Sequence, residues 1–80
     1  MEDETKLDDY EETNYKRALI FFERKAIVHA SLQSGKFYNG RLFSVSVKFF
    51  EIHDRVSGLQ LVFFSELSKP LQEYIVGGKE

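Results

Sequence analysis

The chain has 80 residues, enough for one domain, and 42% of them are hydrophobic, including eight Phe and four Tyr, which is a globular composition. It contains no Cys, which excludes disulfides and thiolate metal sites, and no apolar run long enough for a transmembrane helix. The acidic start is the reverse of a signal peptide, so we expect a cytoplasmic protein. A domain this short buries only about 60% of the surface of its unfolded form, and we expect self-association to supplement its core.

The net charge of −2 conceals an uneven distribution. The first twelve residues hold seven of the thirteen acidic residues and one of the eleven basic ones, so the rest of the chain is mildly basic. Residues 1–8 are predicted to form a disordered acidic tail, and residues 77–80 a second short tail. Two interpretations of the acidic segment stay open: a solvated terminus that aids solubility, or an arm that covers a basic face.

Residues 9–25 show the spacing of an amphipathic helix. Asp9 is predicted to be the N-cap, with Glu12 completing a capping box. Four apolar residues lie at i, i+3, i+4 and i+7 and are predicted to face the core together: Tyr15, Ala18, Leu19 and Phe22.

Beyond the helix the hydrophobic period changes to that of strands. Residues 27–32 alternate, Gly35 marks a tight turn, and a long second strand is predicted over residues 37–47. The inward positions of this strand change from even numbers near its start to odd numbers near its end. We therefore predict a strong bend at Gly40, where a bend is sterically cheap.

The remaining chain is predicted to complete the sheet. A third strand is expected around residues 50–53 and a fourth over residues 59–64, which is apolar on both faces. The segment after Pro70 fits either a closing fifth strand or a short helix. Closure into a barrel would remove the exposed edges of so small a sheet. The sequence thus predicts one mostly β domain over residues 9–76: helix 9–25, then a five-stranded, strongly bent antiparallel barrel over 26–76.

The segment from Leu32 to Leu42, LQSGKFYNGRL, resembles the first sequence motif of Sm-like proteins. That motif combines a strand, a turn ending in Gly, an aromatic or aliphatic residue and then Gly-x-Leu. Residues 50–54 and 58–64 fit the third and fourth Sm strands, and the helix precedes them as it does in that family. The resemblance covers roughly residues 10–68 and implies an Sm-like (SH3-like) barrel that forms a homo-oligomeric ring and associates with RNA.

The chain departs from the Sm pattern where that family binds uridine-rich RNA. The usual Asp-x-aromatic-x-Asn between the second and third strands is replaced by SVKFF at residues 46–50. The Arg or Lys followed by Gly at the end of the fourth strand is replaced by Phe64-Ser65. The scaffold is retained while the usual base pocket is not, and fold alone does not establish function.

Five residues are candidates for a nucleic-acid contact. By the resemblance, Lys48 and Phe49 would lie at the inner rim of a ring, and Lys36, Arg41 and Arg55 lie in or near predicted turns and outward strand positions. A base stacked on an aromatic ring contributes about 1–3 kcal/mol while a cation meets the phosphate. The other interpretation is that Phe49 belongs to the core or an interface and that the cations are scattered surface charge.

The fourth strand is the candidate oligomer interface. It has more apolar surface than an isolated barrel needs, at Leu59, Leu61, Val62, Phe63 and Phe64. The resemblance implies that its edge pairs with the fifth strand of a neighbouring copy, and repetition of that contact closes a ring. The alternative function is an Sm-like protein–protein interaction module that binds no RNA.

No pattern of residues indicates catalysis. The chain has no Gly-x-Ser-x-Gly elbow and no Cys nucleophile, and His29 and His53 fall on different predicted strands. His53 and Asp54 are adjacent in a strand and point to opposite faces, so they form no dyad. We expect a protein that is not an enzyme, with no cofactor, metal site, small-molecule substrate or membrane partner.

Overall fold

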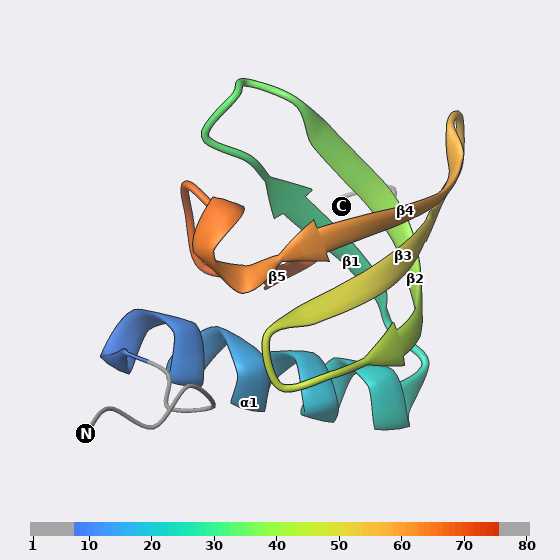
Figure 1. Ribbon diagram of the computed structural model, residues 1–80. Helices are drawn as coiled ribbons and strands as arrows, with labels where there is room; N and C mark the ends of the chain where they lie inside the picture. The colour runs from blue at the N-terminus through green and yellow to red at the C-terminus, as the bar shows by residue number, and fades with distance from the viewer. Residues whose placement is uncertain (1–7, 76–80) are drawn as a thin grey trace.

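The computed structural model describes residues 8–75, in which one α-helix precedes a five-stranded sheet (Figure 1). The elements are α1 (Asp9–Arg24), β1 (Ile27–Ser31), β2 (Phe37–Val45), β3 (Phe49–Asp54), β4 (Gly58–Phe63), the 3-10 helix η1 (Phe64–Glu66) and β5 (Gln72–Glu73). The helix and the mostly β composition are confirmed. Of the predicted tails at 1–8 and 77–80, residues 1–7 and 77–80 lie outside the described residues, whereas Asp8 is the N-cap of α1 and does not belong to a tail.

The sheet is antiparallel with the strand order β4-β3-β2-β1-β5, and it is not closed. The predicted barrel is therefore corrected to a strongly curved open sheet with β4 and β5 at its two edges. The reason is the shortness of β5, which has two residues and pairs with β1 alone. The segment before β5 adds one isolated bridge between Leu67 and Leu32 and does not reach β4.

The curvature of the sheet is concentrated in β2. Residues 37–41 of β2 pair with β1 and residues 40–45 pair with β3, so only Gly40 and Arg41 have partners on both sides. A β-bulge then lies at Phe43, because Leu42 pairs with Ile52 but Ser44 pairs with the next residue, Glu51. The predicted change of face holds only for Val45, which packs against the core; Phe43 and Val47, predicted on the same face, are 59% and 42% exposed, and the strand ends at Val45. The bulge produces the change, three residues beyond the predicted position at Gly40.

Gly40 has a different role from the one predicted. A Cβ atom built at this position would lie 1.8 Å from the carbonyl oxygen of His53 and 2.6 Å from its carbonyl carbon. The backbone of β3 at His53 thus occupies the place of a side chain at residue 40, and only glycine fits there. Gly35, in contrast, has a φ of 95° in the turn before β2, as the turn signal predicted.

The N-terminus of α1 is capped one residue earlier than predicted. The carboxylate of Asp8, not Asp9, accepts a hydrogen bond from the backbone N–H of Glu11, and the Glu11 carboxylate accepts one from the N–H of Asp8. This is a complete capping box. The helix ends at Arg24, and the left-handed conformation of the C-cap residue Lys25 directs the chain into β1.

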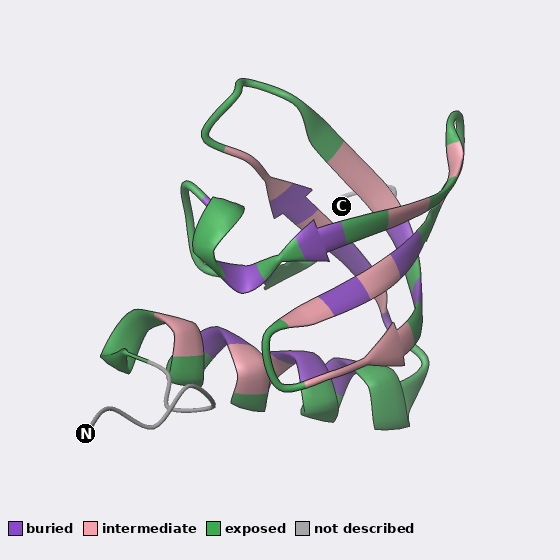
Figure 2. Cartoon of the chain, viewed as in Figure 1, coloured by how far each residue is buried: buried purple, intermediate pink, exposed green. Residues whose placement is uncertain are grey.

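The buried face of α1 also differs from the prediction. Asn14, Ala18 and Phe21 face the core, whereas Leu19 and Phe22 are 38% and 40% exposed. The buried face differs from the predicted one because α1 packs against β2 and η1. In addition, α1 is hydrogen-bonded to the segment that leads into β5. In Figure 2 the buried residues of the helix and of the strands lie on the sides that face each other. The largest wholly buried side chains are Phe50, Phe64, Ile52, Leu67, Leu71, Val28 and Val62.

Candidate functional site

The outward side of β4 carries a row of exposed apolar side chains. Leu59, Leu61 and Phe63 alternate along the strand and are exposed by 45%, 48% and 45%. β4 has a strand partner on one side only among the described residues, because it is an edge of the sheet. An exposed apolar edge strand is a template for pairing with another chain.

The row on β4 continues across β3 to β2. Phe63 lies opposite Phe49, with ring centroids 5.6 Å apart, and Leu59 lies opposite His53, whose ring is 6.0 Å from that of Phe43. Phe43 is 59% exposed because the bulge directs it outward. We call this surface the outer apolar face; its apolar members are Phe43, Phe49, Leu59, Leu61 and Phe63. The outer apolar face is therefore the candidate interaction surface of the described residues.

Two residues of the predicted oligomer interface lie elsewhere. Val62 and Phe64 have no exposed surface. Val62 points inward because side chains alternate along β4, and Phe64 turns inward where η1 begins. There the Phe64 ring packs against Phe50 and Tyr15, with centroid distances of 5.4 Å and 6.0 Å. The burial of these two side chains accounts for the apolar residues on the inward face of the predicted fourth strand, while Leu59, Leu61 and Phe63 form its outward face.

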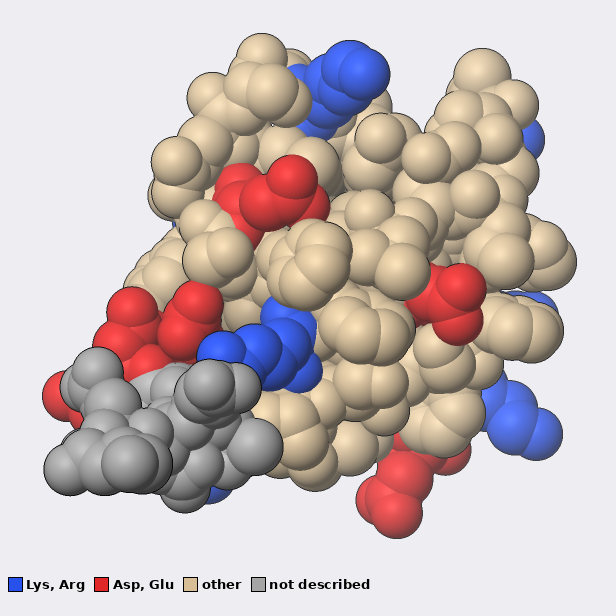
Figure 3. Space-filling model, in the orientation of Figure 1, with Lys and Arg blue, Asp and Glu red and all other residues tan. Residues whose placement is uncertain are grey.

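The structure distributes the five candidate nucleic-acid residues over three places. Lys48 and Phe49 lie at the β2–β3 turn, next to η1, where the Lys48 carbonyl accepts the N–H of Phe64. Arg41 lies on β2 and donates from Nε to the carbonyl of Lys25 at the helix end, with 3.1 Å between these atoms. Lys36 and Arg55 lie in two other turns that face each other. On the side drawn in Figure 3 the Lys and Arg side chains are separated by uncharged surface, so this side has no continuous basic patch.

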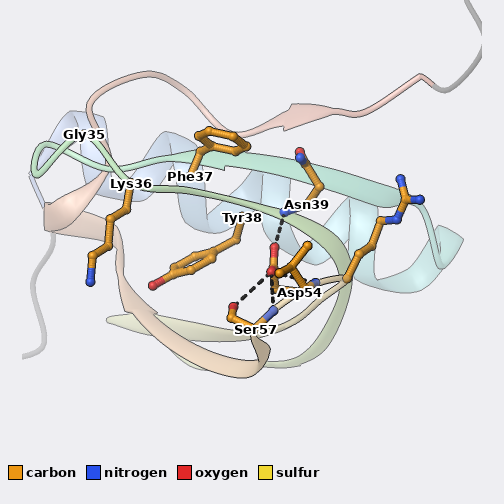
Figure 4. A pocket seen from close by; sticks show the side chains of 9 residues that line it. Gly35, Lys36, Phe37, Tyr38, Asn39, Asp54 and Ser57 are labelled. Carbon is orange, nitrogen blue, oxygen red and sulfur yellow. Dashed lines mark hydrogen bonds between the residues drawn. The ribbon is translucent and has the colours of Figure 1, made fainter.

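A cleft of about 580 Å³ separates the β1–β2 turn from the β3–β4 turn (Figure 4). Its lining residues are Gly35, Lys36, Phe37, Tyr38, Asn39, Asp54, Arg55, Val56 and Ser57. Of these, only Lys36 and Arg55 are candidates from sequence. The cleft itself was missed because its two walls are about twenty positions apart in the sequence and no local pattern connects them.

Asp54 holds one wall of this cleft in place. Its carboxylate accepts hydrogen bonds from the backbone N–H groups of Ser57, Asn39 and Val56 and from the Ser57 hydroxyl, at 2.8 to 3.0 Å. These bonds, that from the Ser57 N–H first among them, lower the pKa of Asp54 from 3.8 to about 2. Asp54 is therefore ionised at neutral pH and ties the β3–β4 turn to β2.

The two histidines lie in separate aromatic surroundings. His29 is half-buried on β1, with Nδ1 bonded to Asn39 Oδ1 and Nε2 3.0 Å from the Ser31 hydroxyl oxygen. Its ring lies between those of Phe37 and Tyr74, at centroid distances of 5.6 Å and 6.3 Å. Within residues 8–75, no group of three or more His, Asp or Glu side chains is placed to hold a metal ion.

The fold and these surfaces define a class: a small, mostly β domain with one N-terminal helix and an open five-stranded antiparallel sheet. No helix of the described region has the length and hydropathy needed to cross a bilayer. No family model matches the chain, and no curated protein matches it either. The Sm-like resemblance therefore stays a prediction.

Proposed function

We propose that this protein is a non-enzymatic, Sm-like binding module that assembles with copies of itself through β4 and binds single-stranded RNA in the assembled form. The observation that carries the proposal is that β4 is an edge strand with Leu59, Leu61 and Phe63 exposed along it. Self-association completes the sheet and covers apolar surface in one step.

The composition of β4 supports pairing with a further strand. Charged residues, Pro or a bulge commonly protect the edge strands of proteins from pairing with other chains. The sequence of β4, GLQLVF, contains no charged residue and no Pro, and β4 pairs with β3 without a bulge. The opposite edge of the same sheet is β5, so a second copy offers a complementary edge. A head-to-tail contact between β4 and β5 that closes on itself leaves no free edge.

Exposed cations beside aromatic rings support RNA as the ligand. Lys48 adjoins Phe49 in sequence, and Lys36 lies on the same side of the chain as the half-buried Tyr38 in Figure 4. Such pairs bind a phosphate and stack a base without reading sequence. A single copy presents few of these pairs, and an assembly would repeat them around one particle.

A protein–protein module that binds no RNA is the second candidate. The outer apolar face favours this function, because it carries little charge. Of the three β3 residues opposite Leu59, Leu61 and Phe63, Glu51 is the only Asp, Glu, Lys or Arg, and its carboxylate accepts a hydrogen bond from the Ser44 hydroxyl. A face of this kind suits an apolar partner surface and offers nothing to phosphate.

Two measurements test the proposal. Light scattering should give a mass that is a multiple of 9.4 kDa, and a monomer at high concentration would disprove assembly. Titration with labelled oligouridine and oligoadenine should show binding that weakens between about 50 mM and 200 mM salt, because phosphate contacts release counterions. If the protein is an oligomer but binds neither oligonucleotide at the lower salt concentration, RNA binding is wrong and the protein–protein module is the remaining candidate function.

A further inference from the structure

The cleft between the β1–β2 and β3–β4 turns is formed before any ligand binds. On one side, the N–H of Leu32 donates to the carbonyl of Lys36 and the N–H of Gly35 donates to the carbonyl of Leu32, at 2.8 Å and 3.0 Å. On the other side, Asp54 and the N–H of Arg55 hold the β3–β4 turn against Asn39. Because both turns are hydrogen-bonded closed, the cleft needs little reorganisation to bind a ligand.

One aromatic ring and one cation extend into this cleft from the same strand end. In Figure 4 the side chains of Lys36 and Tyr38 lie on the same side of the chain, while Phe37 points to the other side. Tyr38 is half-buried and packs against the core, so its ring is fixed in position.

The charge of the cleft favours an anion. Lys36 and Arg55, both exposed, come from opposite walls, and Asp54 is the one acidic residue in the lining. The carboxylate of Asp54 already accepts four hydrogen bonds from Asn39, Val56 and Ser57. Its charge is thus partly compensated by these N–H and O–H dipoles, while the two cations lie at the surface of the cleft.

The volume of the cleft lies within the range of ligand sites. Ligand sites span about 300–1,000 Å³, and this cleft has about 580 Å³ and is open to solvent along its length. An open cleft lets the phosphates before and after a bound nucleotide continue along the strand. A base stacked on an aromatic ring with cations at its phosphate is the common mode of single-strand binding.

We propose that this cleft binds one nucleotide of single-stranded RNA, with the base against the Tyr38 ring and the adjoining phosphates contacted by Lys36 and Arg55. This inference rests on the proposed RNA binding and assigns it to a particular site, separate from the predicted Lys48–Phe49 pair. The β2–β3 turn that carries Lys48 lies beside α1 in Figure 1, and the two turns of the cleft lie on the opposite side of the sheet.

The test compares single variants in the oligonucleotide titration described above. Lys36→Gln and Arg55→Gln should each reduce the slope of log affinity against log salt by about 0.7, the value for one phosphate contact on a single strand. Tyr38→Leu, which removes the ring and keeps apolar bulk, should weaken binding about 5- to 150-fold, the equivalent of one lost stack. Tyr38→Phe should leave the affinity within about twofold, because it keeps the stacking surface.

Lys16→Gln is the matched control, because Lys16 is an exposed lysine on α1 that, among residues 8–75, forms an ion pair with Glu12 alone. This variant should bind RNA like the parent chain. Thermal melting and the solution mass of each variant show that a loss of binding is not a loss of folding or assembly. Photo-cross-linking with a 4-thiouridine oligomer needs no substitution and should label the peptide that contains Tyr38.

The outcomes separate the inference from the function on which it rests. If the parent chain binds RNA and Lys36→Gln, Arg55→Gln and Tyr38→Leu bind equally well, the cleft is not the site. Loss of affinity in Lys48→Gln alone, with a cross-link near Phe49, would move the site to the β2–β3 turn and overturn the inference while RNA binding stands. If the parent chain binds no RNA at low salt, both the RNA function and this site are wrong.

Discussion

The side-chain carbonyl of Asn14 accepts a hydrogen bond from the backbone N–H of Leu71, 57 positions along the chain, with 2.7 Å between the two atoms. The amide nitrogen of Asn14 donates to the carbonyl of Tyr10 at 3.2 Å, so both ends of this wholly buried side chain are satisfied. Arg17 donates from Nε to the carbonyl of Leu71 at 2.6 Å. Helix α1 thus holds the segment that leads into β5.

Replacing Asn14 with Ala should lower the free energy of unfolding by about 1–3 kcal/mol, because the buried N–H of Leu71 loses its acceptor. Urea denaturation measures this change. Thr13→Ala is the control, since the exposed Thr13 hydroxyl donates to the carbonyl of Asp9 within the same helix. This variant should lower the free energy of unfolding by less than about 0.5 kcal/mol. Equal costs for the two variants would contradict the role of Asn14.

Gly40→Ala should destabilise the protein by at least about 3 kcal/mol, the upper end of the range for overpacking, because the added Cβ meets the backbone of His53 and not a flexible side chain. Gly58→Ala provides the comparison. A Cβ at Gly58 has no atom within 4 Å, so only its φ of 85° opposes the substitution, at about 1–2 kcal/mol. Urea denaturation compares the loss of unfolding free energy in the two variants. A smaller loss for Gly40→Ala than for Gly58→Ala would show that β3 can move away from β2.

The stability of the protein should depend on Asp54 at acidic pH. The pKa of Asp54 is lowered from 3.8 to about 2, so its contribution is fully present above the unfolded value of 3.8 and is lost as the pH falls through about 2. The difference in unfolding free energy between the parent chain and Asp54→Asn should therefore be constant from pH 7 to about 5 and shrink between pH 4 and 2. A difference that does not change over this lower range would show that the carboxylate charge is not what holds the β3–β4 turn.

Assembly should depend on the outward side chains of β4. Leu61→Lys places a charge in the middle of the exposed row, which is how natural edge strands avoid pairing, and should reduce the solution mass toward 9.4 kDa. The side chain is 48% exposed, so the monomer itself should keep its fold, which circular dichroism checks.

Leu19→Lys on α1 is the matched control for that experiment, because Leu19 is also a partly exposed leucine but lies away from β4. It should leave the mass unchanged. If Leu61→Lys keeps the mass of the parent chain, β4 is not the contact between copies. A drop in mass for Leu19→Lys alone would place that contact on the helix.

Local sequence determined most of the elements of this protein. The spacing over residues 9–25 predicted α1 within one residue, and alternation predicted the first four strands and the turn at Gly35. These features follow from side-chain periodicity and from the φ that glycine allows, both of which are properties of neighbouring residues. The exposure of Lys36 and Arg55 in turns was predictable for the same reason.

The tertiary structure alone decided which surfaces these elements present. Asn14 replaced Leu19 on the buried face of α1 because its partner, Leu71, lies at the other end of the chain. The sheet stayed open because β5 is too short to bridge from β1 to β4, and Val62 and Phe64 entered the core while Leu59, Leu61 and Phe63 remained outside. The cleft beside Tyr38 exists because the β1–β2 and β3–β4 turns lie opposite each other in the folded sheet. Each of these outcomes depends on contacts between residues far apart in sequence, and such contacts leave no trace in local periodicity.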